Sequence, residues 1–182
     1  MTTLIKLRTR KPKKMATITT DRLMLRPLTI DDAEAAFEWT GDERVARYMI
    51  YSTHESVETT KEWLRSINTS DTAYEFGFVR RSDNKLIGAG GIRLKEDGFC
   101  EFGYNLRYDC WGMGYTTEAV KAMMDFVRRS FGEVRFKAMC ADENTASAHV
   151  IEKCGLVFKG YGEYSSYDGK KTFKARIYVS KE

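Results

Sequence analysis

The chain has 182 residues, of which 42% are hydrophobic, 13% aromatic and 31% charged. That length suits one domain, and the composition excludes a membrane protein and a wholly disordered chain. The formal net charge of +4 belongs to one end, because residues 1–14 hold six basic residues and no acidic one, which leaves −2 for the remainder. We therefore expect a disordered basic tail over residues 1–14 and a single folded domain over residues 15–182.

The tail has neither the apolar core nor the cleavage site of a secretory signal, and no apolar run approaches the roughly 18 residues that cross a bilayer. A cytoplasmic protein without membrane contact is the expectation. The cysteines and histidines lack metal-ligand and catalytic-triad spacing, so we expect free thiols, no bound metal and no hydrolase triad. The cysteines and histidines of the chain are Cys100, Cys110, Cys140, Cys154, His54 and His149.

The first third of the chain predicts one strand and three helices. Apolar residues among Thr and Arg predict a strand over residues 16–28. A helix over residues 31–39 follows, with Asp31 or Asp32 as its N-cap, because acidic residues are favoured in the first turn. Two further helical stretches are expected over residues 43–48 and 55–67.

The middle of the chain predicts an antiparallel meander, because turn residues separate three alternating segments at hairpin lengths. These strands are expected over residues 74–80, 86–94 and 99–106. From residue 115 onward, helical and strand patterns alternate. The expected elements there are a helix over 115–130, a strand over 134–140, a helix over 144–154 that ends at Gly155, and strands over 157–161 and 172–179.

These elements predict an α/β fold. Its sheet is mixed and mostly antiparallel, with about seven strands flanked by helices and a strand-helix-strand crossover in the second half.

The segment from Glu101 to Glu118 reads as a strand, a loop with Gly112 and Gly114, and the start of a helix. Glycines at a helix entrance let several amide N–H groups point at one spot, where the helix dipole adds positive potential. This arrangement suits an anion, although two glycines are also compatible with a turn alone.

Two common phosphate-binding motifs do not match this loop. A Walker loop requires Lys after the last glycine, and Tyr115 follows Gly114 here. The dinucleotide fingerprint requires a third glycine where Thr117 stands. A kinase, an ATPase and a dinucleotide-binding enzyme are therefore disfavoured.

Three motifs in chain order carry a family resemblance. They are Thr20-Asp-Arg-Leu-x-Leu-Arg-Pro27, Trp111-Gly-x-Gly-Tyr-x-Thr-Glu-Ala119, and Asn144-x-x-Ser147 with Lys153-x-Gly155. Over residues 16–180 the chain resembles the GNAT N-acetyltransferase superfamily, in the branch that includes the ribosomal-protein N-terminal acetyltransferases. It departs from the superfamily's Arg/Gln-x-x-Gly-x-Gly/Ala loop at Trp111, which replaces the Arg or Gln, and at Thr116, which replaces the small residue.

The resemblance implies acetyl-CoA as the cosubstrate. Amides of residues 113–117 are then expected to hold the pyrophosphate, and the strand over 104–106 to pair its backbone with the pantetheine arm. Asn144 is expected to touch the cofactor as well as to cap its own helix. The implied cofactor-binding residues are Tyr104, Asn105, Leu106, Trp111, Gly112, Met113, Gly114, Tyr115, Thr116, Thr117 and Asn144.

Acetyl transfer to an amine needs a deprotonated nitrogen, so a base or a water relay is required. Glu101 is the candidate base, acting through water, because it matches the position of the family's frequent acidic residue, and Glu75 is the alternative. Ile151 stands where many relatives carry a tyrosine, so Ser147 is the candidate donor to the leaving thiolate. Glu101 is also compatible with a solvated strand position, and Ser147 with a helix-start serine that bonds local backbone.

Three hypotheses describe the function, and the first two differ in the amine acceptor. The acceptor is the N-terminal α-amine of a protein or peptide, or it is a small amine such as an amino sugar, a polyamine or an amino acid. The third hypothesis is a non-catalytic acyl-CoA-binding or nucleic-acid-associated module that uses the basic tail, although we do not expect nucleic acid as a partner. In the superfamily the acceptor groove forms from segments that correspond to residues 37–51 and 165–171, and a homodimer is common among relatives.

Overall fold

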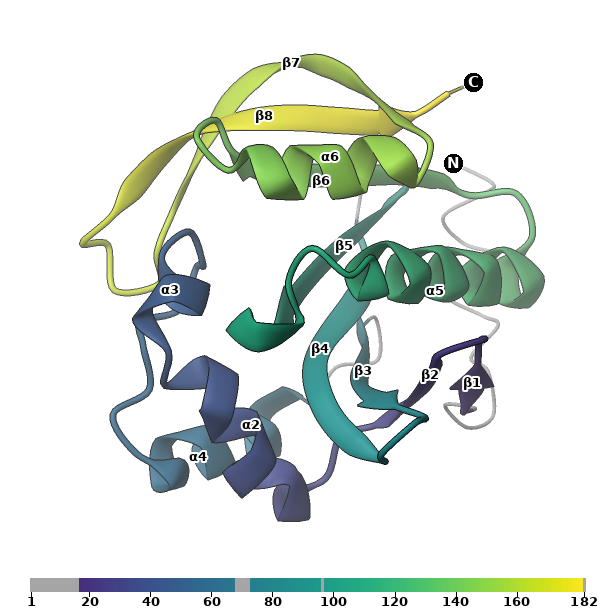
Figure 1. Cartoon of the computed structure of the whole chain (residues 1–182). Coiled ribbons are helices and arrows are strands. Elements are labelled where there is room, and N and C mark those ends of the chain that lie inside the picture. The colour runs from purple at the N-terminus through teal and green to yellow at the C-terminus, as the bar shows by residue number, and fades with distance from the viewer. Residues whose placement is uncertain (1–16, 68–72, 96, 182) are drawn as a thin grey trace.

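An eight-stranded sheet runs through the structure, a computed structural model that describes residues 17–67, 73–95 and 97–181 (Figure 1). Its strand order is β1-β2-β3-β4-β5-β6-β8-β7, and one neighbouring pair is parallel. The predicted mixed α/β fold, mostly antiparallel and flanked by helices, is confirmed. The basic tail expected over residues 1–14 lies outside the described residues.

The strand expected over residues 16–28 is in fact a hairpin of β1 (Ile18–Thr19) and β2 (Leu23–Pro27), which raises the number of strands from about seven to eight. The Thr20 N–H donates to the Leu23 carbonyl at 2.9 Å, and the Leu23 N–H donates to Thr20 Oγ1 at 3.0 Å. The chain therefore reverses without the glycine or proline that marks most turns in a sequence.

The expected meander consists of β3 (Ala73–Arg80), β4 (Lys85–Leu94) and β5 (Phe99–Leu106). β5 then pairs in parallel with β6 (Arg135–Ala141), and α5 (Tyr115–Phe131) makes the predicted crossover between them. Three residue pairs join the two strands, the last being Glu101 with Lys137. Beyond this pair β5 and β6 separate, so the sheet is split between its two halves (Figure 1).

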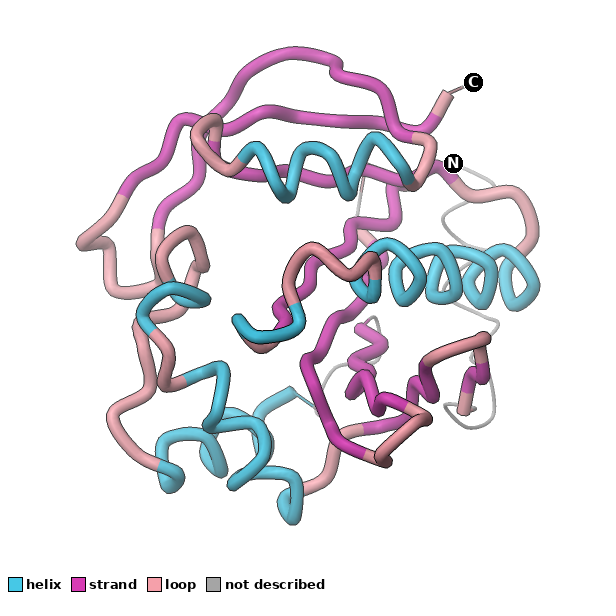
Figure 2. Tube along the Cα trace, in the orientation of Figure 1, coloured by secondary structure: helices cyan, strands magenta, loops and turns pink. Residues whose placement is uncertain are grey.

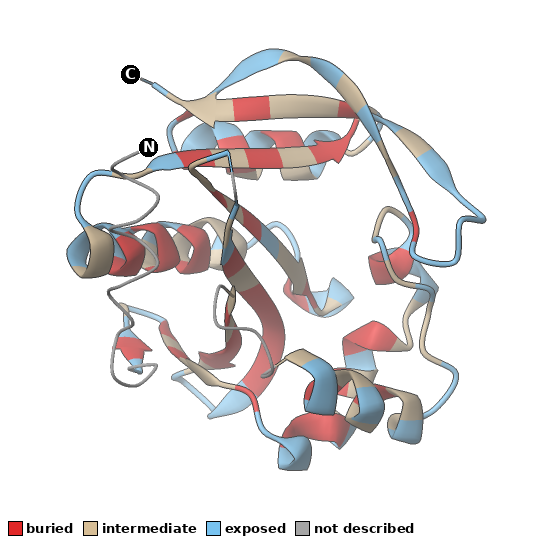
Figure 3. Ribbon diagram, turned by 180° about the vertical axis from the view of Figure 1, so that it is seen from behind, coloured by how far each residue is buried: buried red, intermediate tan, exposed pale blue. Residues whose placement is uncertain are grey.

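The second half of the sheet contains β6, β8 (Thr172–Ser180) and the edge strand β7 (Leu156–Ser165). A bulge at Lys159 interrupts the pairing of β7 with β8. α6 (Thr145–Lys153) covers one face of these strands and ends before Gly155, whose φ of 90° confirms the expected left-handed position. In the described part of the chain, no helix covers the opposite face (Figure 3).

Helices flank both faces of the sheet (Figure 2). α5 and α6 cover a core in which the rings of Phe76 and Phe126 meet edge to face at 5.6 Å. The other face of the meander packs against a smaller core around Trp39, which is fully buried. The elements on that side and in the connections are η1 (Ile30–Asp32), α2 (Ala33–Thr40), α3 (Glu43–Ala46), α4 (Val57–Ile67) and η2 (Tyr108–Cys110).

Asp32 precedes α2 as expected, but its carboxylate reaches back toward β2 instead of capping the helix. It accepts hydrogen bonds from the Thr29 N–H at 2.8 Å and from the Arg26 guanidinium at 2.7 and 2.8 Å. Burial alone would raise the pKa of Asp32, but the bonds from Arg26 and Thr29 outweigh it and hold the pKa below its ordinary value. The carboxylate thus joins the end of β2 to the first helical turn.

Replacing Asp32 by Ala is expected to lower the free energy of unfolding at pH 7 by about 2 kcal/mol, because Arg26 and the Thr29 N–H lose their acceptor. Since folding lowers the Asp32 pKa, its stabilisation is present above the ordinary value of 3.8 and is lost as the pH falls through the lower folded-state value. Urea unfolding between pH 7 and pH 2 should show the difference from wild type shrinking in acid. Asp31→Ala is the control because Asp31 is exposed, and an equal loss there would contradict the assignment.

Candidate active site

The loop between β5 and α5 has the geometry expected of an anion site. Gly112 and Gly114 have φ values of 75° and 78°, in the left-handed region that favours glycine. The first N–H groups of α5 have no intrahelical acceptor, as in every α-helix, and its N-cap Gly114 has no side chain that could accept from them. A Cβ at Gly112 would have nothing within 4 Å, so the space above the loop is open.

The β1–β2 hairpin holds this loop from one side. Arg22 donates from Nη1 to the Met113 carbonyl at 2.8 Å and from Nε to Glu118 at 2.7 Å. Glu118 also accepts from Thr20 Oγ1 at 2.6 Å and from the Arg22 backbone N–H at 2.9 Å. Burial would raise the pKa of Glu118, but the bonds from Thr20 and Arg22 lower it overall, so the carboxylate stays charged. Hairpin, loop and α5 are therefore one hydrogen-bonded unit.

Arg22 also brings positive charge to the loop. Its Nη2 lies 3.4 Å from the position that a Cβ on Gly114 would occupy, and its guanidinium stacks over the Tyr115 ring at 4.6 Å. Arg22 and Glu118 both stand in motifs that carry the family resemblance. Their pairing cannot be predicted from local sequence patterns, because the two residues are 96 positions apart.

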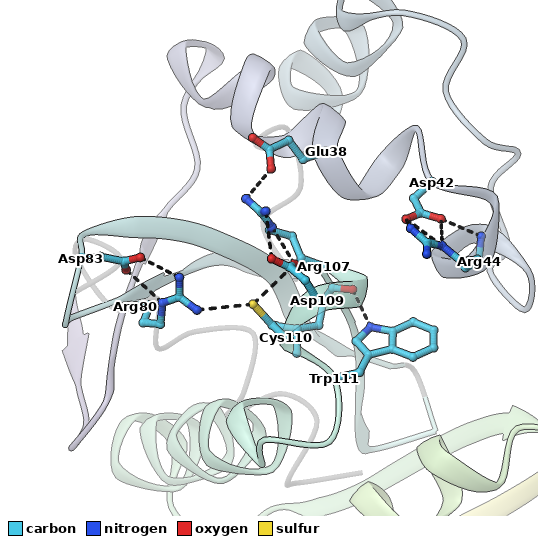
Figure 4. A network of polar contacts seen from close by, with 10 residues as sticks. Glu38, Asp42, Arg44, Arg80, Asp83, Arg107, Asp109, Cys110 and Trp111 are labelled. Atoms are coloured by element: carbon cyan, nitrogen blue, oxygen red, sulfur yellow. Dashed lines mark hydrogen bonds and ion pairs between the residues drawn. The ribbon is translucent and has the colours of Figure 1, made fainter.

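Ion pairs and an indole hold the loop from the other side (Figure 4). Arg107 binds Glu38 of α2 and, at 3.0 Å, Asp109. Trp111 donates from its indole Nε1 to the Leu106 carbonyl at 2.8 Å. Trp111 was expected to contact the cofactor; here its side chain fixes the end of β5, and Leu106 keeps one carbonyl lone pair for a ligand.

The structure brings three of the expected site residues together where β5 and β6 separate. The Tyr104 hydroxyl lies 2.8 Å from Ser147 Oγ and donates to the Ser147 carbonyl at 3.2 Å. Asn144 Oδ1 accepts the Ser147 N–H at 3.1 Å, which confirms Asn144 as the N-cap of α6. Burial raises the pKa of Tyr104, so its hydroxyl keeps its proton and remains a donor.

The two candidate bases lie on the face of the sheet opposite α5. Glu101 on β5 pairs with Lys95 at 2.8 Å, which directs its carboxylate toward the turn between β4 and β5. Glu75 on β3 has Arg93 at 3.7 Å. Burial raises the pKa of Glu75, and the charge of Arg93 partly opposes this. Neither carboxylate contacts the Tyr104–Ser147 pair on the other face.

The two segments expected to form an acceptor groove do meet. Tyr164 donates to the Tyr48 carbonyl at 2.7 Å, and the Tyr167 N–H donates to the Ile50 carbonyl at 2.7 Å. Ser52 Oγ donates to Asp168 at 2.8 Å. The tip of the β7–β8 hairpin is therefore attached to the segment after α3.

Asn105 links β5 to the same segment. Its side chain accepts from the Ala89 N–H at 3.2 Å and donates to the Tyr51 hydroxyl at 3.3 Å. Burial raises the pKa of Tyr51 to about 12, with the Asn105 bond opposing it. The side chain of Asn105 thus serves the acceptor side, whereas the sequence predicted a backbone role toward pantetheine.

The described residues also bear on a metal site and on a membrane span. Within residues 17–67, 73–95 and 97–181, no three His, Cys, Asp or Glu side chains gather as a metal site would require. The cysteines are buried free thiols. No helix of the described part is both long and apolar enough to cross a membrane.

Comparison with protein families decides the assignment. Residues 22–157 match the model of the acetyltransferase (GNAT) domain. The chain belongs to the GNAT acetyltransferase family. This confirms the family resemblance and an acyltransferase activity for the chain.

Individual relatives agree with this assignment. The chain is 28% identical over 170 residues to the uncharacterized N-acetyltransferase p20 of Bacillus licheniformis, covering 91% of this chain and 94% of p20. A GNAT-family acetyltransferase from Bacillus anthracis has the same fold, with a TM-score of 0.79 at 24% identity over 90% of this chain and 97% of that one. RimL, the ribosomal L7/L12 α-N-protein acetyltransferase solved with coenzyme A, has a TM-score of 0.75 at 17% identity over 90% and 97%.

Replacing Gly114 of this GNAT domain by Val is expected to weaken acetyl-CoA binding, because the β-branched residue cannot adopt the left-handed backbone easily and its side chain would meet Arg22. Gly132→Val is a matched control, since Gly132 has a φ of 83° at the other end of α5. Calorimetric titration with acetyl-CoA should show a weaker Kd for the first variant alone. Equal Kd values in all three proteins would refute the loop assignment.

Arg22→Ala is expected to weaken acetyl-CoA binding by about tenfold, because a charge-assisted contact and the restraint on Met113 are both lost. Arg81→Ala is the control: Arg81 donates to the Thr20 and Asp21 carbonyls of the same hairpin but does not bond the loop. Titration with acetyl-CoA at two salt concentrations measures both variants. A larger loss in Arg81→Ala would assign the effect to hairpin stability.

Proposed function

We propose that this chain transfers an acetyl group from acetyl-CoA to the N-terminal α-amine of a protein or peptide. The observation that carries the proposal is the separation of β5 from β6 after Glu101, between the glycine loop and the Tyr104–Ser147 pair. The opening has an anion site at one end and the partly buried hydroxyl groups of Tyr104 and Ser147 beside it. A thioester on a long phosphorylated arm suits such an opening.

The residues around the opening fit acetyl-CoA. The amides of residues 113–117, with the Arg22 guanidinium beside them, suit the negative charge of a pyrophosphate. Beyond Glu101 the backbone of β5 has lost β6 as a partner, so residues 104–106 have groups free to pair with the amides of pantetheine. Trp111 and Asn144 hold the strand end and the α6 N-terminus that frame this path.

Ser147 is the group we assign to the leaving thiolate. In the transfer, a C–N bond forms to the acetyl carbon, the C–S bond breaks and the thiolate sulfur needs a proton or hydrogen bond. The Ser147 hydroxyl supplies it, and the Tyr104 hydroxyl at 2.8 Å orients it. Burial raises the Tyr104 pKa, so the Tyr104 hydroxyl keeps its proton at neutral pH.

The open face of the second half of the sheet supports a polypeptide acceptor. Met139 and Ile177 are paired across β6 and β8 on the face opposite α6, and both are partly exposed. This face carries no helix of the described chain (Figure 3), and it includes β6, which separates from β5 after Lys137. RimL, which has the same fold, is an α-N-protein acetyltransferase. An extended N-terminus can therefore approach without rearranging the domain.

One observation favours a small amine instead. The bonds of Tyr164 and Ser52 between the hairpin tip and the segment after α3 close one side of the acceptor groove. An enclosed groove suits an amino sugar, a polyamine or an amino acid. A homodimer and a cytoplasmic location stay predictions, as does the expectation that nucleic acid is not a partner.

Release of CoA thiol from acetyl-CoA tests the function directly. The acceptors are peptides with a free α-amine and dimethylated lysine, the same peptides with a blocked α-amine and free lysine, and a panel of small amines. The proposal expects thiol release with the first set and acetylation at the α-nitrogen by mass spectrometry. Turnover confined to the small amines would select the alternative, and binding of acetyl-CoA without any turnover would refute the proposed catalysis.

Ser147→Ala is expected to lower kcat by about 100-fold while acetyl-CoA affinity changes little, because the hydroxyl acts on the departing sulfur. Tyr104→Phe should lose less, since Ser147 remains. Thr145→Ala, an exposed substitution at the start of the same helix, is the control. If Thr145→Ala matches the loss in Ser147→Ala, the effect is one of helix structure.

A further inference from the structure

Three neighbouring strands place a carboxylate and two glycines in one row. Glu75 of β3 is opposite Gly91 of β4, and Gly91 is opposite Gly103 of β5. A Cβ on Gly91 would lie 2.2 Å from Glu75 Oε2, so the carboxylate lies directly across Gly91. A Cβ on Gly103 would have nothing within 4 Å. The Glu75 side chain thus crosses β4 toward an open place above β5.

This row lies on the acceptor side of the opening. Phe76 faces α5, and since alternate residues of a strand point to opposite faces, Glu75 faces away from it. Asn105, two residues beyond Gly103 on the same face, bonds Tyr51 of the acceptor segment. Gly103 is also two residues beyond Glu101, where the pairing of β5 with β6 ends.

Strand spacing sets the reach of the carboxylate. Paired strands lie about 4.8 Å apart, so a carboxylate over β4 is about one strand spacing from Gly103. A nitrogen above Gly103 is therefore within reach of Glu75 through one water. We propose that Glu75, rather than Glu101, accepts the proton of the acceptor ammonium, an inference that rests on the proposed acetyl transfer.

Contacts of the two carboxylates separate their roles. Glu101 is held by Lys95 at 2.8 Å and directed toward the β4–β5 turn, away from the opening. Among the described residues, Arg93 is the charged side chain that reaches Glu75, at 3.7 Å, and half of its own side chain is exposed. Burial shifts the pKa values of Tyr51 and His54, two further titratable groups of the acceptor side, toward the neutral form.

Burial supports the assignment, since it raises the pKa of Glu75 above its ordinary value despite Arg93. A carboxylate whose pKa lies closer to neutrality is the stronger proton acceptor at working pH. Glycine at position 91 is required for this placement of Glu75, because any larger residue there would displace the carboxylate from its path across β4.

The steps balance as follows for an ammonium acceptor. Glu75 takes one proton, and the free nitrogen pair then forms the C–N bond to the acetyl carbon as the C–S bond breaks. The nitrogen loses a second proton when the amide forms. One of the two protons ends on the CoA sulfur by way of Ser147, and the other leaves to solvent from Glu75. No oxidant or further reactant is required.

Glu75→Gln and Glu101→Gln, two isosteric changes on the same face, test the inference in the full chain with the best acceptor of the amine panel. We expect Glu75→Gln to lower kcat/KM for the acceptor by about 100-fold, with acetyl-CoA Kd unchanged, and Glu101→Gln to lose less. Glu133→Gln, an exposed change after α5, is the control.

The pH profile distinguishes a base from a merely structural carboxylate. An α-amine has a pKa near 8, so above about pH 9 it arrives deprotonated and the deficit of Glu75→Gln should shrink. Gly91→Ala should reproduce this pH-dependent loss by displacing Glu75. Gly103→Ala should instead raise the acceptor KM without changing the profile.

Two results would overturn the inference while the proposed function stands: wild-type-like kcat/KM in Glu75→Gln, or a deficit that does not shrink with rising pH. Failure of the wild-type protein to release thiol with any amine, despite binding acetyl-CoA, would refute the function itself. The experiment therefore distinguishes failure of the Glu75 assignment from failure of the proposed acetyl transfer.

Discussion

The site depends on an incomplete strand pairing. β5 and β6 share three residue pairs and then diverge, although both continue as strands, to Leu106 and Ala141. Backbone groups that leave a ladder need other partners, and a split in the middle of a sheet offers them in a row. The glycine loop, the Tyr104–Ser147 pair and the acceptor segments are all arranged around this split. Closing it by continued pairing would keep the fold and remove the site.

The loop at one end of the split is held by contacts from distant parts of the chain. Arg22 and Glu118 bind it from the hairpin and from α5. On the other side, Trp111 donates to Leu106 of β5, and Arg107 joins Asp109 to Glu38 of α2. Two left-handed glycines alone would leave a flexible turn. Side-chain bonds on both sides of the loop fix the direction of its amide N–H groups before a ligand binds. Binding therefore costs little conformational entropy in the loop.

Most elements could be predicted from the sequence, because period and turn residues are local signals. The meander, the crossover helix and the Asn144 cap follow from such signals. The hairpin at Asp21 did not, because its turn contains neither glycine nor proline and is held by the Thr20 hydroxyl. The family, too, was recognisable from motifs, whereas the contacts inside the site were not.

Those contacts depend on register, which a single sequence does not reveal. The Glu75 carboxylate lies across β4 because Glu75 is opposite Gly91, and a shift by one residue would turn it to the other face. Glu101 matched the family's acidic position but is bound to Lys95, a contact set by the turn between β4 and β5. Arg22 needed Glu118, 96 positions away.

The bulge at Lys159 affects whether copies of the molecule can pair through the edge of the sheet. β7 is an edge strand that carries Phe158 and Tyr161, both about half exposed, and a flat edge of this kind invites strand addition from another chain. The extra lysine breaks the regular spacing of the edge and places a charge on it. The apolar side chains of β7 can therefore stay exposed to water while continuous sheet growth between molecules is disfavoured.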